Sequence, residues 1–186
     1  MQEFVAVLTY PGCISLEVAL AAELLSQRFR IVNATPDGRD VDGNSGLPLK
    51  AQASYASLNL ENCRAILVPG GDPGCLVGNR DVISVLQEAD RRRLYIAAIC
   101  AGPSVLGMAG ILKGRRIAHG YGPEQLEFLK EIFTEVQLSD EVFVEDGHIL
   151  TAKPQAHIQF GVELAARLGI GDPATTTKRI DYYRGT

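Results

Sequence analysis

A short apolar run that stops at a cysteine constrains the fold of this chain more than any other feature. Residues 94–99 are apolar without interruption, and such a run, bounded by turn residues, predicts a strand buried on both faces. Cys100 follows directly, and small or turn-forming residues come next. Apolar side chains then recur at helical spacing. The pattern predicts a buried strand, a sharp turn at Cys100 and a helix over residues 104–112.

A cysteine at such a junction matches the geometry of a nucleophile elbow, with cysteine in place of serine. The nucleophile of an elbow lies in a strained turn, so we expect Cys100 to have a positive φ. The positive end of the following helix dipole favours thiolate over thiol. Because a free cysteine is usually a small buried hydrophobe, a purely structural Cys100 is the alternative that the residues leave open.

Apolar strands alternate with helical segments through the first two-thirds of the sequence. This alternation predicts an α/β fold with a mostly parallel sheet and helices on both of its faces. A hairpin is expected at residues 143–151, with Asp146 and Gly147 as its turn. The sequence shows neither an internal repeat nor a linker, so a single domain over residues 1–186 is expected. The predicted strands span residues 4–8, 30–34, 65–68 and 94–99, and the predicted helices span 16–27, 80–92, 104–112, 123–132 and 158–168.

Composition and charge argue against several classes of protein. The apolar fraction of 46% and the charged fraction of 22% are those of an ordinary globular protein. A net charge of −4 gives no electrostatic basis for binding nucleic acid or an anionic membrane. No run approaches transmembrane length, and the first residues lack the features of a secretory signal. The four cysteines include no C-x-x-C pair, which argues against zinc, so we expect a cytoplasmic protein without metal or organic cofactor.

Three loops of the predicted sheet fall where ligands usually bind. In an open parallel sheet, the site lies outside the carboxyl ends of the strands. The loop after residue 8, the pair Gly70 and Gly71, and Cys100 all come at such ends. We expect the backbone N–H groups of Gly70, Gly71 and Ala101 to form an oxyanion hole. A plain tight turn at the two glycines is the alternative.

The residues around the cysteine resemble a known family. The hexapeptide Ala-Ile-Cys-Ala-Gly-Pro at residues 98–103, the Val-Pro-Gly-Gly stretch at 68–71 and an early glutamate in the first helix are similar to the ThiJ/PfpI superfamily. Within it, the chain most resembles the branch of the parkinsonism-associated deglycase and its bacterial relatives. The resemblance implies a flavodoxin-like three-layer sandwich and a homodimer.

The resemblance also implies roles for three side chains. Cys100 matches the family's reactive, easily oxidised cysteine, and Glu17 matches the acid that hydrogen-bonds the sulfur as a protonated carboxyl. His119 matches the histidine that approaches the cysteine in this branch, although its flanking residues differ. If Glu17 contacts the sulfur, the first strand and the strand before Cys100 must be near neighbours in the sheet.

Departures from the family pattern reduce the number of activities that we expect for this chain. Family members described as proteases carry a histidine directly after the nucleophile, and Ala101 stands there in this chain. A classical peptidase is therefore not expected. Isonitrile hydratase relatives usually carry Asp where Glu17 stands and Thr after the nucleophile. Residues 106–116 nevertheless resemble the helix after the nucleophile in those relatives, so this activity stays open.

Other residues are weaker candidates for a place in the site. His157 lies just before a predicted helix, where it could reach the strand-end site, and we rank it below His119. His157 and Gly70 are expected to line the pocket. His148, beside the hairpin turn, is expected to be solvated. Cys13 lies in the loop after the first strand and is either a resolving partner for Cys100 or a spectator thiol.

These observations favour a cysteine-dependent enzyme of the glyoxalase or deglycase type. The Cys100 thiolate would attack a small 2-oxoaldehyde, and the resulting oxyanion would meet the N–H groups of Gly71 and Ala101. Glu17 and His119 would then move the protons that lead toward a hydroxy acid. The substrate class comes from the resemblance. Two alternatives remain: an oxidative-stress sensor that uses Cys100 without turnover, and an isonitrile hydratase or amidase-like hydrolase.

Overall fold

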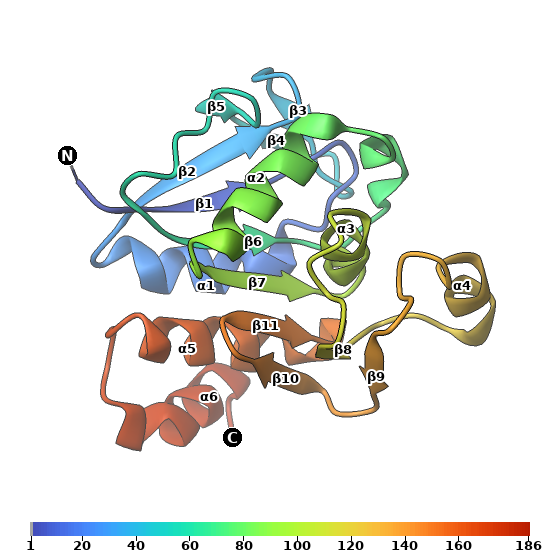
Figure 1. The fold of residues 1–186 in the computed structure, drawn as a ribbon. Helices are drawn as coiled ribbons and strands as arrows, with labels where there is room; N and C mark the ends of the chain where they lie inside the picture. Colours follow the sequence, from blue (N-terminus) through green and yellow to red (C-terminus); the bar gives the residue numbers. More distant parts are fainter. Residues whose placement is uncertain (1) are drawn as a thin grey trace.

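The predicted apolar runs form the central strands of one sheet. The computed structural model describes residues 2–186, and seven strands pair in the order β10-β11-β7-β6-β1-β2-β5 (Figure 1). Within this seven-stranded sheet of the described residues, only the β10–β11 pair is antiparallel, and it is the predicted hairpin. The fold is therefore the expected α/β arrangement with a mostly parallel sheet. The strands are β1 (Phe4–Leu8), β2 (Arg30–Thr35), β5 (Ala53–Ser54), β6 (Cys63–Val68), β7 (Tyr95–Ile99), β10 (Phe143–Asp146) and β11 (Ile149–Ala152).

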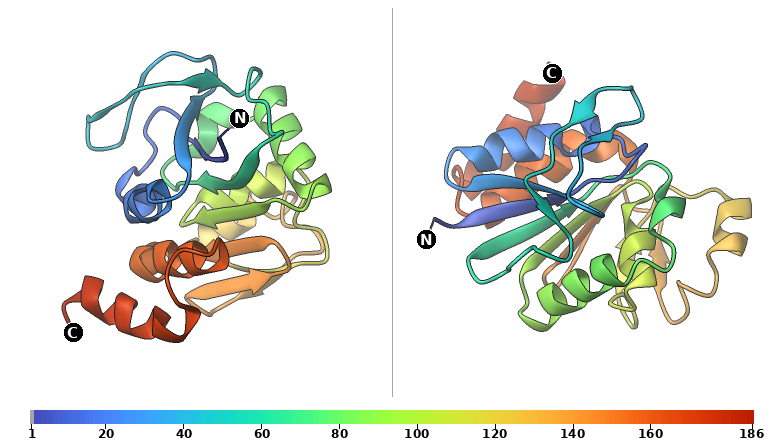
Figure 2. Two further views of the ribbon diagram at one scale, coloured as in Figure 1. Left: turned by 90° about the vertical axis from the view of Figure 1, so that its left-hand side faces the viewer. Right: turned by 90° about the horizontal axis from the view of Figure 1, so that it is seen from above.

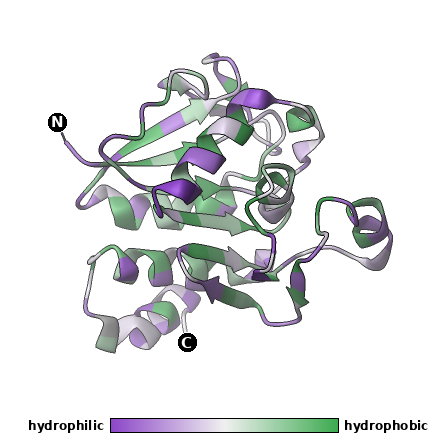
Figure 3. Ribbon diagram, viewed as in Figure 1, coloured by the Kyte–Doolittle hydropathy of each residue, from purple (hydrophilic) through white to green (hydrophobic). Residues whose placement is uncertain are grey.

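Helices cover both faces of this sheet (Figure 2). Side chains alternate along a strand, so β1 sends Val5 and Val7 to one face and Ala6 and Leu8 to the other. The first pair packs among residues of α1 and α5, and the second packs among residues of α2 and α3. The central strands are apolar on both sides (Figure 3) because neither face meets water. These helices are α1 (Leu16–Ser26), α2 (Arg80–Arg91), α3 (Gly102–Met108) and α5 (His157–Arg167).

Smaller elements surround the sheet. The strands β3 and β4 form a short antiparallel hairpin, while β8 and β9 form a separate parallel pair. The helix α4 stands apart from the layers, beyond α3 (Figure 1). None of the helices within residues 2–186 is long and apolar enough to cross a membrane. These elements are β3 (Val41–Asp42), β4 (Pro48–Leu49), β8 (Arg116–Ala118), β9 (Gln137–Ser139), α4 (Pro123–Phe128), α6 (Thr176–Arg184) and the 3-10 turns η1 (Pro73–Leu76), η2 (Pro154–Ala156) and η3 (Pro173–Thr175).

The structure corrects several predicted boundaries. The helix after Cys100 begins at Gly102 and ends at Met108, short of the predicted residue 112, and Gly110 then has a φ of 72°. The helix α4 ends at Phe128, short of the predicted residue 132. The sequence analysis predicts no element over α6, because no apolar stripe marks this segment. In the structure, Ile180 is the one buried residue of α6.

Sheet order decides which strand ends meet. The strands β1 and β7 are not paired with each other, and β6 lies between them and is parallel to both. Their carboxyl ends therefore open at the same edge of the sheet. The first helix, the loop after β6 and the turn after β7 all start from this edge.

Candidate active site

Cys100 occupies the turn between β7 and α3 with a φ of 62°, as the elbow pattern predicts. A positive φ is strained for a residue with a side chain. Backbone hydrogen bonds hold the residue there: its N–H donates to the Ala152 carbonyl at 2.9 Å, and its carbonyl accepts from the Gly120 N–H at 3.3 Å. The strained turn leaves the Cys100 side chain half-buried at the carboxyl edge of the sheet.

Gly70 brings the loop after β6 against the sulfur. A Cβ atom on Gly70 would lie 2.5 Å from Cys100 Cβ, 2.8 Å from Cys100 Sγ and 2.6 Å from Glu17 Oε2. No side chain fits in that space. The same distances show that the sulfur and the carboxylate oxygen of Glu17 flank a single point beside Gly70.

Glu17 is buried in the first turn of α1, with only 5% of its surface exposed. Its Oε2 accepts a hydrogen bond from the Gly70 N–H at 2.7 Å, and its carboxyl is also hydrogen-bonded to the Cys100 thiol. The structure therefore brings Glu17 to Cys100, as expected. The expectation that the Gly70 N–H belongs to the oxyanion hole is wrong, because Glu17 already accepts from that group.

Burial controls the ionisation of this pair. Burial raises the pKa of the Glu17 carboxyl, against hydrogen bonds from Cys100 and Gly70 and a nearby His157 charge that lower it. Burial also raises the pKa of Cys100 to about 11, and a negative charge on Glu17 adds to this effect. Backbone N–H groups of Ala101 and Gly71 act in the opposite direction. The helix dipole is expected to favour the thiolate, but burial and the negative charge of Glu17 have the larger effect and raise the pKa of Cys100.

The two groups favour one negative charge between them. A second negative charge would be disfavoured by burial and by the first charge, so the pair titrates as a unit. Moving the thiol proton from Sγ to the Glu17 carboxyl creates the thiolate without changing the net charge of the site. The neutral carboxyl then donates a hydrogen bond to the sulfur anion, which stabilises it.

Two backbone N–H groups face the sulfur. The N–H groups of Gly71 and Ala101 are both directed at Cys100 Sγ, which places two donors where an oxyanion bonded next to the sulfur would develop. Gly71 has a φ of 114°, and a Cβ there would lie 2.5 Å from the Gly12 carbonyl oxygen. Only glycine can therefore present its N–H at this position.

Two tyrosines that the sequence analysis did not single out hold these loops. The Tyr121 hydroxyl donates to the Ala101 carbonyl at 2.7 Å and accepts from the Ser104 N–H at 2.8 Å. The Tyr10 hydroxyl lies 2.9 Å from the Gly70 carbonyl oxygen, to which it donates. Each hydroxyl fixes a peptide next to a group of the site. Tyr121 stands between two glycines in the sequence, which is the one signal that could have drawn attention to it.

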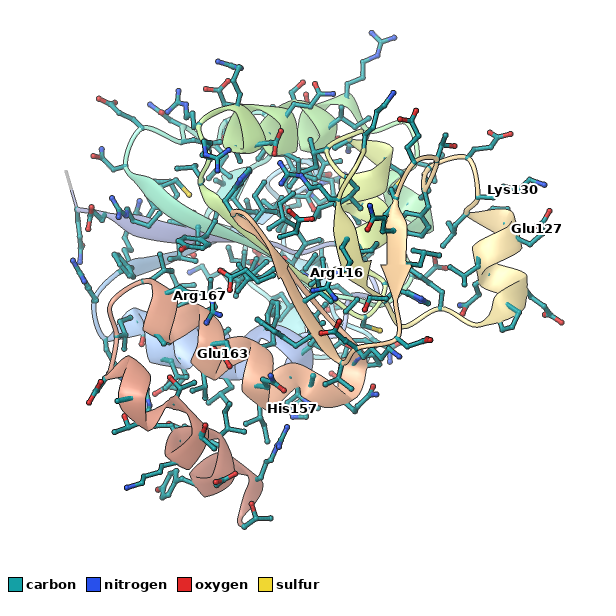
Figure 4. The ribbon with its side chains drawn as sticks, turned by 60° about the horizontal axis from the view of Figure 1, so that its bottom comes forward. Arg116, Glu127, Lys130, His157, Glu163 and Arg167 are labelled. Carbon is teal, nitrogen blue, oxygen red and sulfur yellow. The ribbon has the colours of Figure 1, made fainter. Side chains whose placement is uncertain are left out.

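The two candidate histidines differ in position. His119 follows β8, and its Nδ1 accepts from the Tyr121 N–H at 3.2 Å while its ring stacks on the Tyr121 ring. Burial lowers the pKa of His119. His157 begins α5 (Figure 4), and its charge acts on Glu17. Within residues 2–186, no side-chain hydrogen bond joins either histidine to Cys100.

The prediction that His148 is solvated is wrong. His148 is only 6% exposed, and its Nε2 lies 2.8 Å from Asp90 Oδ1. Arg115 also contacts Asp90, at 3.0 Å. The contact lies where β11 begins and α2 ends, at the edge of the sheet opposite Cys100. Asp90 comes from a helix far away in the sequence, so the hairpin pattern around His148 did not reveal it.

Cys13 packs behind the site. It is buried and pairs with Gly71 through an isolated antiparallel bridge. All four cysteines are free, so Cys13 forms no disulfide with Cys100 in this structure. Within residues 2–186, no group of three or more His, Cys, Asp or Glu side chains is arranged to hold a metal ion.

An apolar pocket of about 410 Å³ opens beside Gly71 and Ala101. It lies between η1, α3 and α4, on the side of the elbow that faces away from α1. Gly70 and His157, which the sequence analysis placed in the pocket, are not among the residues that line it. Gly70 is covered by Cys100 and Glu17, and His157 belongs to the helix layer on the other face of the sheet.

Comparison with known proteins agrees with this fold. Residues 3–167 match the model of the DJ-1/PfpI family. The solved structure of the DJ-1 superfamily protein Atu0886 from Agrobacterium tumefaciens is similar, with a TM-score of 0.84, 26% identity and 98% of each chain covered.

Two curated relatives carry names that describe an activity. The deglycase PH1704 from Pyrococcus horikoshii is 30% identical over 77 residues, which cover 41% of this chain and 46% of that protein. The isonitrile hydratase from Pseudomonas putida is 27% identical over 148 residues, which cover 76% of this chain and 61% of that protein. The chain therefore covers less than two thirds of the length of either relative.

Proposed function

The chain belongs to the DJ-1/PfpI family, and on that premise we propose that it is a cofactor-independent enzyme whose Cys100 attacks small 2-oxoaldehydes. One observation carries the proposal. Cys100 sits at positive φ with Glu17 hydrogen-bonded to its sulfur and the N–H groups of Gly71 and Ala101 directed at it. A nucleophile, a proton acceptor and two oxyanion donors therefore meet at one point, which is the arrangement that carbonyl addition requires.

The first step is addition to the aldehyde. The thiol proton moves to the Glu17 carboxylate, and the Cys100 sulfur forms a bond to the aldehyde carbon. The electron pair of the C=O bond moves onto oxygen, where the N–H groups of Gly71 and Ala101 stabilise the oxyanion. The neutral Glu17 carboxyl then returns its proton to this oxygen, which gives a hemithioacetal.

The second step moves hydrogen between the two carbons of the substrate. A base removes the proton from the carbon bonded to sulfur, and that electron pair forms a C=C bond to the neighbouring carbonyl carbon. The electron pair of that C=O bond moves onto its oxygen, which takes a proton to give an enediol. Protonation at the neighbouring carbon, with loss of the hydroxyl proton from the carbon bonded to sulfur, gives a thioester, which water hydrolyses to a 2-hydroxy acid and the free thiol. The net change is the addition of one water molecule. We assign Glu17 as the base and His119 as the second proton carrier.

The named hydratase relative supports a second candidate, an isonitrile as the electrophile. The same thiolate would add to the isonitrile carbon, and water would then release a formamide. A third candidate is the oxidation sensor. A sulfinate on Cys100 would accept hydrogen bonds from the donors that face the sulfur.

Turnover of methylglyoxal by the purified protein tests the proposal. We expect lactate to form, and we expect Cys100→Ser to abolish its formation. Cys75→Ser is the matched control, because Cys75 is an exposed cysteine; this variant is expected to keep full activity. Equal lactate formation by wild type and Cys100→Ser would contradict the proposal. Formamide from an isonitrile without lactate would favour the second candidate, and peroxide-dependent sulfinate without turnover would favour the third.

A further inference from the structure

The pocket beside the elbow has a chemical character that the reaction alone does not explain. Its volume of about 410 Å³ lies within the range of small-molecule sites and far exceeds what the methyl group of methylglyoxal would fill. Its lining comes from the loop after β6, from α3, and from α4 and the residues that follow it. The lining residues are Gly71, Asp72, Pro73, Gly74, Val77, Ala101, Ser104, Met108, Tyr121, Glu124, Gln125, Phe128, Leu129 and Ile132.

The pocket lining is mostly apolar. Side chains such as Met108, Leu129 and Ile132 contribute to its wall, and the Tyr121 ring adds an aromatic surface. The Tyr121 hydroxyl is already engaged with Ala101 and Ser104. Such a surface favours the burial of an alkyl or aryl group.

The charged residues of the pocket are acidic. Asp72 and Glu124 are exposed, and no lysine, arginine or histidine is among the lining residues. A phosphate or carboxylate on the ligand would therefore meet negative charge and no cation. This charge pattern disfavours anionic ligands and leaves neutral ones.

The pocket adjoins the candidate site through two shared residues, although Cys100 and Glu17 are not among the residues that line it. Gly71 and Ala101 line it, and the same two residues direct their N–H groups at Cys100 Sγ. A carbonyl oxygen held by these donors would therefore leave the rest of its molecule next to the apolar wall.

We propose that this pocket holds the alkyl or aryl substituent of a neutral substrate, so that bulky apolar 2-oxoaldehydes are preferred over methylglyoxal and over anionic analogues. The inference rests on the proposed function and specifies the substrate class of the same site. The substituent gains free energy by leaving water for the pocket, and it places the aldehyde carbon at the sulfur.

Competing substrates test this preference. We expect kcat/KM for phenylglyoxal to exceed that for methylglyoxal by roughly tenfold, the order of magnitude that burial of a phenyl ring supplies. Phe128→Asp introduces a charge at the pocket; its side chain is 87% exposed, so the change spares the core. We expect it to remove most of the preference for phenylglyoxal over methylglyoxal. Leu47→Asp, at an exposed apolar residue of the loop between β3 and β4, is the matched control and should retain the preference.

A charge exchange tests the exclusion of anions. Glu124→Lys is expected to raise kcat/KM for 4-carboxyphenylglyoxal several-fold, because it replaces a negative charge of the pocket by a positive one. Glu127→Lys is the matched control on the same helix. Glu127 does not line the pocket, and it pairs with Lys130 on the exposed side of α4 (Figure 4). The Glu127→Lys variant should leave kcat/KM for 4-carboxyphenylglyoxal unchanged.

Alkylation of Cys100 separates this inference from the proposed function. We expect N-benzyl iodoacetamide to label Cys100 faster than iodoacetamide, and we expect Phe128→Asp to remove the difference. If no aldehyde is turned over but this labelling preference appears, the proposed function fails and the pocket inference stands. Equal labelling by the two reagents, or equal kcat/KM for the two aldehydes, would overturn the inference. So would a dimer that Phe128→Asp separates without any change in labelling, because a second copy would then fill the pocket.

Discussion

Removal of the Glu17 carboxyl is expected to change how Cys100 alkylation depends on pH. In the wild type, the pair should lose its first proton at the raised pKa of Glu17 and its second near the raised pKa of Cys100, about 11. Between these two pH values the pair shares one negative charge. In part of the population, the negative charge is on the Cys100 sulfur, and the neutral Glu17 carboxyl donates a hydrogen bond to that sulfur. Alkylation should therefore rise in two steps, with a plateau between them.

Glu17→Ala removes the lower step. A hydrogen bond to a charged group contributes about 1.5–3 kcal/mol, which corresponds to roughly 1–2 pKa units at about 1.4 kcal/mol per unit. Near neutral pH, we therefore expect Glu17→Ala to be alkylated roughly 10- to 100-fold more slowly than the wild type. Glu17→Gln keeps a donor for the sulfur and an acceptor for the Gly70 N–H, so its rate should fall between the two.

The assay is iodoacetamide labelling followed by intact mass, from about pH 5 to pH 10, a range that brackets the ordinary cysteine pKa. A Cys75→Ser background removes the exposed competing thiol, and Cys100→Ser gives the blank. Coincident profiles for all three proteins would refute the reasoning. Faster labelling of Glu17→Ala at neutral pH would also refute it, because Glu17 would then act only as a carboxylate that suppresses ionisation of the thiol.

Further predictions concern the supports of the site and the rest of the fold. Gly70→Ala should slow Cys100 alkylation at least tenfold, because its Cβ would lie 2.8 Å from the sulfur; a rate within twofold of wild type would contradict this. Tyr121→Phe should lower kcat for the aldehyde with little change in KM, because it frees the Ala101 carbonyl, which belongs to the peptide next to the one that carries the Ala101 oxyanion donor; a KM effect alone would argue otherwise. Burial lowers the pKa of His148, so the folded protein binds fewer protons than the unfolded chain, and stability should fall as pH drops below about 6.5. Thermal melts of His148→Gln should show a weaker decline than wild type in that range, and parallel curves would exclude His148 as the cause. We also propose a homodimer, and light scattering at micromolar concentration that shows only monomer would remove that proposal.

Local sequence was sufficient to predict the elbow and the layer architecture. The uninterrupted apolar run before Cys100, followed by small residues, predicts a buried strand that turns sharply, and the φ of 62° agrees. Both are consequences of contacts within a few residues, since a strand buried on both faces must be apolar throughout. Periodicity likewise placed α1, α2 and α5 within a residue or two of their observed ends.

The partner of the sulfur could be named from the family resemblance, but its location depended on the order of strands. Glu17 and Cys100 meet because β6 lies between β1 and β7 and all three strands open at one edge. The use of the Gly70 N–H by Glu17, and the rise in the pKa of Cys100, follow from burial at that edge. Neither can be read from a list of residue types.

Contacts between distant segments decided the remaining features. His148 is buried because Asp90 of another element meets it, which a hairpin pattern cannot indicate. The apolar pocket exists because α4 stands away from the sheet and faces α3 and η1. By itself, the sequence determined which residues enter strands, helices and the cysteine turn, because those choices depend on local periodicity and backbone sterics. Only the tertiary structure decided which of these groups meet, because charge, burial and cavity shape arise where separate segments pack together.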